Sequence, residues 1–245
     1  MTLLQAKNLA QSYDGQEIIR DISLELGKNE IACLIGTSGV GKTTLFQILS
    51  GLHQPTQGQV LLEGKNITGQ AGKISYMLQK DMLLPYRTIE DNIALPLLIH
   101  GASKKKARAQ IGIYFDEFGL SGTQKKYPSQ LSGGMRQRAA LLRTYMFANK
   151  VALLDEPFSA LDALTKHDMH KWYLNVMQKI ELSTIFVSHD INEAIYLSDK
   201  VYVMGGCPGT IIKEIPIVRS IPDRDAFSLS PQFLEYKKQL LDCLQ

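Results

Sequence analysis

Short apolar runs separated by polar turns fill the first part of the chain and predict β-strands at residues 3–9, 17–26 and 31–35. The third run leads into a glycine-rich segment, residues 36–44, and then into a stretch with helical spacing, residues 45–49. The pattern therefore predicts a strand, a tight turn and a helix in direct succession.

The remaining strand-like runs are between four and nine residues long. They lie at residues 60–63, 74–78, 151–156, 184–187, 200–204 and 210–218. The last two runs flank a segment rich in glycine and predict a hairpin. Strands that alternate with helices predict an α/β fold.

Helical periodicity replaces the strand pattern between residues 80 and 149. Thr88 and Ser103 precede two predicted helices as N-caps, and the second helix carries an apolar stripe over residues 107–118. A third helix is predicted over residues 135–147. This middle segment is thus expected to form a helical lobe.

Composition narrows the classes of protein without choosing one. The 245 residues, 44% of them apolar, suffice for one large domain, and a net charge of +3 does not by itself indicate nucleic acid. Three widely spaced cysteines predict neither a disulfide framework nor a zinc site, and Cys33 is expected in the core. With no membrane-length apolar run and no basic leader in view, we expect a cytosolic chain.

The glycine-rich segment reads Gly-Thr-Ser-Gly-Val-Gly-Lys-Thr-Thr and matches the phosphate-binding pattern G-x-x-x-x-G-K-[ST]. Glycines let successive backbone N–H groups converge on one anion, and the helix that begins near Lys42 directs its positive dipole end at the same point. Lys42 is expected to reach the β- and γ-phosphates, and the Thr43 hydroxyl is expected to bind Mg²⁺.

Polar side chains follow three other predicted strands. Asp155 and Glu156 end an apolar strand. Two carboxylates at the end of such a strand cost free energy unless a cation or a reacting water lies nearby. We assign Asp155 to Mg²⁺ and Glu156 to the attacking water. Gln79 and His189 also follow strands, and ligands of parallel sheets gather at the carboxyl ends of the strands.

A further motif, Leu131-Ser132-Gly133-Gly134, stands between the phosphate loop and the Asp155–Glu156 pair. Together with Gln79, Asp162 and His189 in this order, the motifs make the chain resemble an ATP-binding cassette (ABC) ATPase over residues 1–215. The resemblance implies a P-loop NTPase (RecA-like) core with an antiparallel β subdomain and an inserted α-helical subdomain. Residues 1–245 would form one ABC domain, comprising the core (1–79 and 150–220), the helical subdomain (80–149) and a tail (221–245).

The resemblance also assigns roles. Glu156 would be the general base, His189 would hold the γ-phosphate, and Gln79 would contact Mg²⁺ and the attacking water. Ser132 and Gly134 would contact the γ-phosphate of the nucleotide bound to a second cassette, with Asp162 linking the two sites. The residues implied to bind ATP are Tyr13, which would stack on adenine, and Gly36, Ser38, Gly39, Gly41, Lys42, Thr43 and Thr44.

Two positions depart from the commonest pattern of the family. Met135 stands where a glutamine often follows the Leu-Ser-Gly-Gly motif, and the segment 145–147 is bulkier than usual. Because Ser132 and Gly134 carry the phosphate contacts, hydrolysis is expected to survive the first change.

Finer resemblance, in residues 82–88 and 157–165, is to cassettes of bacterial importers of nitrate, sulfonates, taurine or thiamine-precursor pyrimidines. It implies a second ABC subunit, as in a homodimer, a transmembrane permease and, indirectly, a solute-binding protein, with the chain peripheral at the cytoplasmic face of the membrane. Nucleic acid is not expected as a partner. The alternatives are a soluble ABC ATPase that acts on nucleic acid or ribosomes, and an ATP-dependent regulatory module without hydrolysis.

Overall fold

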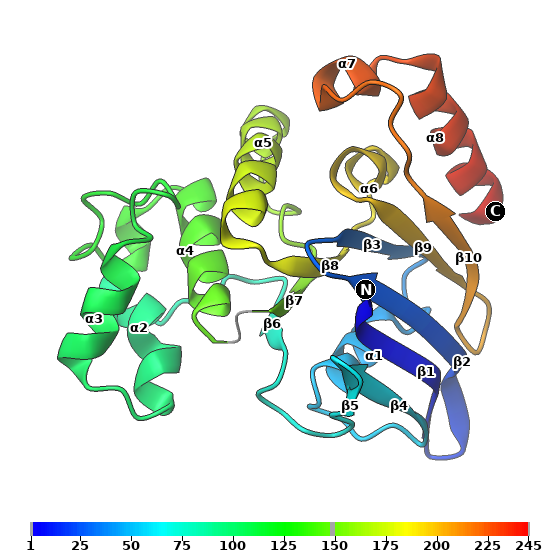
Figure 1. Ribbon diagram of the computed structural model, residues 1–245, viewed down its shortest axis with the longest axis horizontal. Helices are drawn as coiled ribbons and strands as arrows, with labels where there is room; N and C mark the ends of the chain where they lie inside the picture. Colours follow the sequence, from blue (N-terminus) through cyan, green and yellow to red (C-terminus); the bar gives the residue numbers. More distant parts are fainter. Residues whose placement is uncertain (1, 148–149, 245) are drawn as a thin grey trace. The chain divides into compact units, whose positions relative to one another are not determined.

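The computed structural model describes residues 2–147 and 150–244 (Figure 1). Residues 148–149 and 245, which end the predicted helical subdomain and the predicted tail, lie outside the described part. The chain forms two compact units, residues 1–73 with 183–245 and residues 74–182. Each unit is described by itself.

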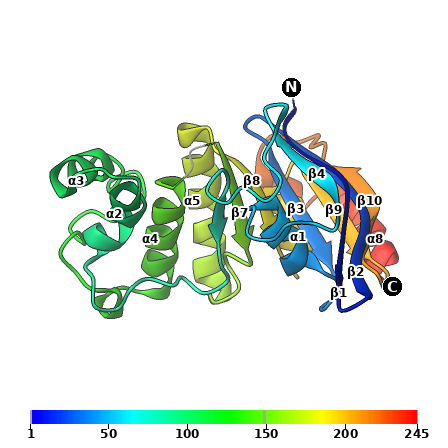
Figure 2. The same cartoon turned by 90° about the horizontal axis from the view of Figure 1, so that it is seen from below.

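An antiparallel sheet built from the N-terminal strands forms one layer of the first unit (Figure 2). Its strands are β1 (Thr2–Tyr13), β2 (Gln16–Gly27), β4 (Gln57–Leu62) and β5 (Lys65–Asn66), and they lie in the order β2-β1-β4-β5. Tyr13, which lies between the predicted strands 3–9 and 17–26, is the last residue of β1 and pairs with Gln16. The tight turn at residues 14–15 allows the hydrogen-bonded pairing of β1 and β2 to continue to the end of the hairpin.

A buried strand, β3 (Ile31–Gly36), organises the other layer of the first unit. It pairs in parallel with both β8 (Ser183–Val187) and β9 (Lys200–Gly205), and β10 (Thr210–Pro216) continues antiparallel to β9, as the hairpin pattern predicts. Every residue of β3 and β8 is buried, because parallel strands are covered on both faces. The chain leaves β3 through the glycine-rich segment and enters α1 (Lys42–Leu49).

Three further helices complete the first unit: α6 (Ile191–Leu197), α7 (Arg224–Ser228) and α8 (Pro231–Leu244). Two arginines in the segment after β10 bind the end of α6 through hydrogen bonds. Arg219 donates to the carbonyl oxygens of Ile195 (3.2 Å) and Ser198, and Arg224 donates to that of Leu197 (3.1 Å). The last carbonyls of a short helix thereby find partners.

The second unit combines a pair of parallel strands with a group of helices. The strands are β6 (Ser75–Met77) and β7 (Val151–Asp155), and the helices are α2 (Ile89–Ile99), α3 (Lys104–Gly112), a 3₁₀ turn (Pro128–Gln130), α4 (Gly133–Tyr145) and α5 (Ala163–Ile180). α2 packs on both α3 and α4 (Figure 1). Thr88 and Ser103 cap α2 and α3 as predicted, since each side chain accepts a bond from a backbone N–H three residues on (3.2 and 3.3 Å).

Some predicted boundaries are wrong. α3 ends at Gly112, where glycine weakens the helix, although Phe115 and Phe118 further along the predicted stripe are buried in the following turns. α4 starts two residues earlier than predicted because Ser132 caps it. In the part of the chain that the structure describes, no helix has the length and apolar character needed to cross a membrane.

We expect Arg219→Met to destabilise the first unit. The change removes the donors that satisfy carbonyl oxygens at the end of α6, and a buried acceptor left without a partner costs about 1–3 kcal/mol. The urea midpoint of the full chain should fall, whereas Lys238→Met, at an exposed position of α8, should leave it in place. Equal midpoints for both variants would contradict this role of the arginine.

Candidate functional site

The glycine-rich segment forms a tight loop between β3 and α1. Gly39 and Gly41 adopt φ angles of 81° and 106°, in the left-handed region that favours glycine. Ser38 and Gly39 are exposed, as is Thr43 in the first turn of α1, whereas Thr44 is half-buried. The loop thus presents its surface at the N-terminus of a helix, the arrangement that binds anions.

Lys42 lies beneath this loop, with only 8% of its surface exposed. Its ammonium group donates to the carbonyl oxygens of Gly36 and Thr37, each at 2.8 Å. A buried ammonium group requires such partners. The bonds hold Lys42 inside the loop that the sequence predicts to bind phosphate.

The turn between β9 and β10 supports the loop from behind. A Cβ atom on Gly209 would lie 2.0 Å from the carbonyl oxygen of Val40, which is too close for any side chain. Gly209 is also bonded through its backbone to β2, donating to Ile18 (2.9 Å) and accepting from Arg20 (3.0 Å). Sequence reasoning identified this segment only as a hairpin turn, since close approach of backbones has no signature beyond the glycine itself.

His189 follows β8, the parallel neighbour of β3, and its side chain is exposed. Because the phosphate loop follows β3, the loop and His189 lie at the same edge of the sheet, as the sequence predicts. The preceding residue fixes the turn: Ser188 is buried, bonds to Glu193 and accepts from the backbone N–H of Asp190 (3.0 Å).

Tyr13 stands at the tip of the β1–β2 hairpin with its ring 39% exposed. Its hydroxyl is hydrogen-bonded to Nδ1 of His53 at 2.9 Å. An exposed aromatic ring in this position is able to stack on a flat ligand. Sequence reasoning gave His53 no role in the site.

The predicted acidic residues lie at the end of β7 in the second unit. The Tyr76 hydroxyl donates to Oδ2 of Asp155 (3.2 Å), and burial together with this carboxylate raises the pKa of Tyr76. Glu156 follows with φ of 47°. Its Oε2 accepts from Nε2 of Gln79 at 2.7 Å, so the structure brings together the two residues that sequence reasoning assigned to the attacking water.

Two helix N-termini of the second unit carry the other predicted residues. Ser132 caps α4 by accepting from the backbone N–H of Met135 (3.3 Å), and Gly134 is buried in its first turn. Asp162 caps α5 by accepting from that of Thr165 (3.0 Å). The side chains of Ser132 and Asp162 are exposed.

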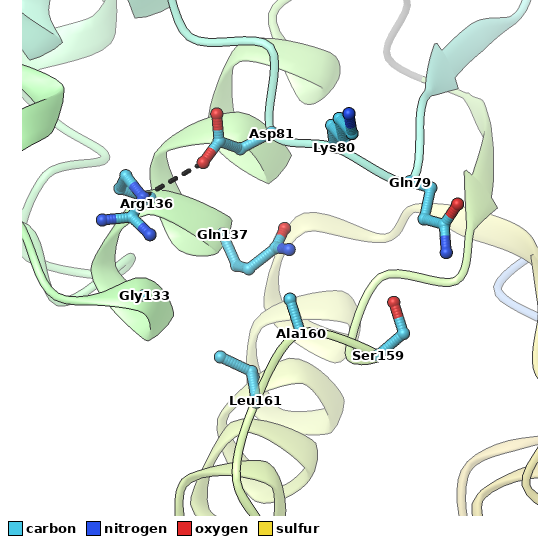
Figure 3. Close-up of a pocket in the computed structure, with 9 residues that line it drawn as sticks. All are labelled: Gln79, Lys80, Asp81, Gly133, Arg136, Gln137, Ser159, Ala160 and Leu161. Atoms are coloured by element: carbon cyan, nitrogen blue, oxygen red, sulfur yellow. Dashed lines mark hydrogen bonds and ion pairs between the residues drawn. The ribbon is translucent and has the colours of Figure 1, made fainter.

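A cavity of about 590 Å³ lies beside Gln79 (Figure 3). In the close-up, the side chains of Gln79, Gln137 and Ser159 point toward the same space. Gln137 is only 6% exposed, and among the described residues its Oε1 has no hydrogen-bond partner. The full lining comprises Gln79, Lys80, Asp81, Gly133, Arg136, Gln137, Ser159, Ala160 and Leu161.

The loop after β6 is fastened to α4 at this cavity. Nε of Arg136 donates to Oδ2 of Asp81 (3.1 Å), and Arg143 donates to the carbonyl oxygens of Asp81 (2.6 Å) and Met82 (2.7 Å). Burial lowers the pKa of Arg143. Sequence reasoning gave Arg136 and Gln137 no role, because contacts between distant segments leave no spacing to recognise.

The residues predicted to hold Mg²⁺ fit this ion by their chemistry. Thr43 offers a hydroxyl, Asp155 a carboxylate and Gln79 an amide oxygen, which are the hard oxygen donors that Mg²⁺ prefers. The Asp155 carboxylate is half-buried and already accepts one hydrogen bond, from Tyr76. Thr43 lies in the first unit, and the other two residues lie in the second.

Comparison with known proteins identifies the family. The model of the ABC transporter family matches residues 19–159. The chain is 41% identical over 84% of its length to the formylaminopyrimidine import ATP-binding protein ThiZ of Halalkalibacterium halodurans, covering 81% of that protein. It is 33% identical over 93% of its length to the nitrate import ATP-binding protein NrtD of Synechocystis, covering 88% of it.

A likeness of fold accompanies these matches. A nucleotide-free ATP-binding cassette from an ABC transporter superposes with a TM-score of 0.79 at 21% identity, with 97% of this chain and 99% of that chain covered. A cassette in its ADP conformation gives a TM-score of 0.78. The chain therefore belongs to the ABC transporter family and is an ATP-binding ATPase with the P-loop fold. The predictions of family, fold class and enzyme class are confirmed.

We expect Gly209→Ala to weaken nucleotide binding. The new methyl group collides with the carbonyl oxygen of Val40 and must displace the phosphate loop, so the dissociation constant for ADP should rise at least about tenfold, the equivalent of ~1.4 kcal/mol. Isothermal titration calorimetry measures this. Gly112→Ala, at the end of α3 where a Cβ meets nothing within 4 Å, is the control and should bind ADP normally.

Proposed function

We propose that this chain is the ATP-hydrolysing subunit of a bacterial importer and drives uptake of a small solute through a partner permease. The observation that carries the proposal is the Gln79–Glu156 hydrogen bond at the end of β7, in a chain whose β3 leads into a phosphate loop. The names of the relatives support import: formylaminopyrimidine for ThiZ, nitrate for NrtD and aliphatic sulfonates for SsuB 2 of Burkholderia cenocepacia. The solute class we propose is accordingly small and nitrate-, sulfonate-, taurine- or pyrimidine-precursor-like.

In this proposal the first unit binds the nucleotide. Tyr13 stacks on the adenine, and Lys42 exchanges its bonds to the loop carbonyls for the β- and γ-phosphates. Gly36, Ser38, Gly39, Gly41, Thr43 and Thr44 surround the phosphates. His189 holds the γ-phosphate from the adjacent strand end.

Hydrolysis requires an ordered water. Glu156 accepts its proton as general base, and Gln79, already bonded to that carboxylate, orients the water. Mg²⁺ bound by Thr43, Gln79 and Asp155 would neutralise charge on the phosphates. The residues of this chain supply the positioning and the proton acceptor.

Two copies of the chain complete each site in a homodimer. Ser132 and Gly134 of one copy meet the γ-phosphate bound by the other, since the N-terminus of α4 presents backbone N–H groups and a positive dipole end to an anion. Asp162, at the N-terminus of α5, links the two sites. ATP thus holds the two copies together, and its hydrolysis weakens the interface between them.

The proposed permease contact lies on residues 78–86, the segment that contains Gln79. Leu78, Met82 and Tyr86 are exposed large apolar side chains within nine residues of sequence, and Tyr86 is 72% exposed. Such clustered exposure is typical of a surface that meets a partner. This contact would hold the chain at the cytoplasmic face of the membrane, with a solute-binding protein acting from the other side. In the predicted division of the chain, the core binds the nucleotide, and the helical subdomain carries Ser132, Gly134 and most of the proposed permease contact.

We expect Glu156→Gln to cut turnover sharply while ATP still binds. The amide keeps an oxygen that can accept from Gln79, but it cannot take a proton from water, and loss of a general base costs about 10²–10⁴-fold in rate. Phosphate release and ATP-dependent dimerisation in size-exclusion chromatography measure the two properties. Lys42→Ala is the contrasting variant and should lose both binding and turnover; normal hydrolysis by Glu156→Gln would remove Glu156 from its role.

We expect Tyr86→Ser to weaken the permease complex. The substitution removes an exposed aromatic surface from the proposed contact without disturbing the core. Co-purification of the chain with its permease from membranes should fall several-fold, whereas Tyr127→Ser, at another exposed tyrosine of the same unit, should co-purify normally. Equal recovery of both variants would place the permease contact elsewhere.

A further inference from the structure

We propose that His53 is a positioning residue for the nucleotide base: it holds the ring of Tyr13 in the orientation in which the ring stacks on that base. The inference rests on the proposed role of Tyr13. Oη of Tyr13 and Nδ1 of His53 lie 2.9 Å apart, and the two rings meet edge to face with centroids 6.3 Å apart. The hydroxyl is therefore held at one end of the ring, and 39% of the residue stays exposed.

His53 is itself fixed to the helix that carries the phosphate loop. The backbone N–H groups of Leu52 and His53 both donate to the carbonyl oxygen of Gln47 in α1 (2.9 and 3.1 Å). Gly51, with φ of 75°, packs so closely against Gln70 that a Cβ would lie 2.4 Å from its carbonyl carbon. The imidazole thus projects from an ordered turn at the end of α1.

The segment after His53 is fastened to the end of β1. The backbone N–H of Thr56 donates to the carbonyl oxygen of Ala10 (2.9 Å), and the Thr56 hydroxyl accepts from the backbone N–H of Ser12 (3.1 Å). The Tyr13–His53 bond is therefore the third in a row of contacts along the same two segments. A row of this kind fixes the distance between the two side chains.

The strand that follows Tyr13 reaches the phosphate loop. Ile18 and Ile19 of β2 pack against Gly41, where a Cβ would lie 2.5 Å from Cγ2 of Ile19. Tyr13 pairs with Gln16, two residues before Ile18. Both partners of the hydrogen bond are thus tied to the phosphate loop, Tyr13 through β2 and His53 through α1.

The energetic effect of His53 is one of ordering. A tyrosine ring that is 39% exposed would otherwise lose rotational freedom only when the base binds, and immobilising such a side chain costs enough to weaken binding about three- to tenfold. The hydrogen bond imposes that order before the nucleotide arrives. Because a stacking face accepts any base, the effect concerns affinity for the base rather than discrimination between purines.

The test compares ADP with inorganic pyrophosphate, which lacks the base, by calorimetric titration of the full chain. His53→Ala and Tyr13→Phe each remove the bond and keep the remaining residue. We expect each to weaken ADP binding about three- to tenfold, and the double variant to be no weaker than either. Pyrophosphate binding should stay within about twofold of the original, because the phosphate loop is untouched.

Two further variants complete the design. His53→Gln offers an amide to the same hydroxyl and should recover most of the ADP affinity. Leu52→Ala changes an exposed neighbour on the same turn and should change neither affinity. Equal weakening of ADP and pyrophosphate by His53→Ala, or losses that add in the double variant, would overturn the proposal, since either result indicates a general structural role.

Tyr13→Ala separates this inference from the proposal on which it rests. Loss of ADP affinity by about tenfold or more in Tyr13→Ala, with normal affinity in His53→Ala, would leave Tyr13 as the stacking residue and refute the role of His53. Normal ADP affinity in Tyr13→Ala would refute both. Weakening in both variants, with pyrophosphate unaffected, supports both.

Discussion

The first unit depends on satisfying a buried positive charge. Lys42 lies under the phosphate loop, and its ammonium group is compensated by the carbonyl oxygens of Gly36 and Thr37. Those carbonyls point inward only because β3 is buried between two parallel neighbours and ends where the backbone must turn sharply. The outer surface of the loop is exposed at Ser38 and Gly39 and lies at the N-terminus of α1, where an anion is favoured. The same turn that shelters the lysine therefore leaves a surface suited to a phosphate.

Capped helix N-termini recur at the proposed functional positions. Ser132 and Asp162 each accept a backbone N–H with a side-chain oxygen, and each is the residue at which the chain enters a helix; Asp190, next to His189, caps α6 in the same way. A cap satisfies one donor and leaves others of the first turn available. A capped N-terminus therefore fixes the position of the preceding loop, and the first turn of the helix can still bind an anion. This combination suits a site that has to bind and release a triphosphate.

The sequence was sufficient for the parts of the structure that local chemistry determines. The glycine-rich loop between a strand and a helix follows from residue type and spacing, as do the caps at Thr88 and Ser103. The structure contains all three features. Contacts between distant segments could not be predicted in this way. The Arg136–Asp81 pair, the approach of Gly209 to Val40 and the bond between Tyr13 and His53 join residues that are 40 or more positions apart, and no periodicity marks them. Helix ends such as Gly112 were also missed, because burial of Phe115 and Phe118 does not require that the helix continue.

The two departures from the family pattern have a physical explanation in the second unit. Met135 contacts Ser132 through its backbone N–H, so the cap of α4 places no demand on the side chain at this position. The bulky segment 145–147 packs against other aromatic rings. The Tyr145 ring centroid lies 5.3 Å from that of Tyr114 and 6.4 Å from that of Phe118, and the Phe147 centroid lies 5.4 Å from that of His100. The Tyr145 ring at the end of α4 thus packs against the turns that follow α3, and the Phe147 ring packs against the C-cap residue of α2. These bulky residues follow or end α4, whereas the cap at Ser132 lies at its other end and does not depend on them.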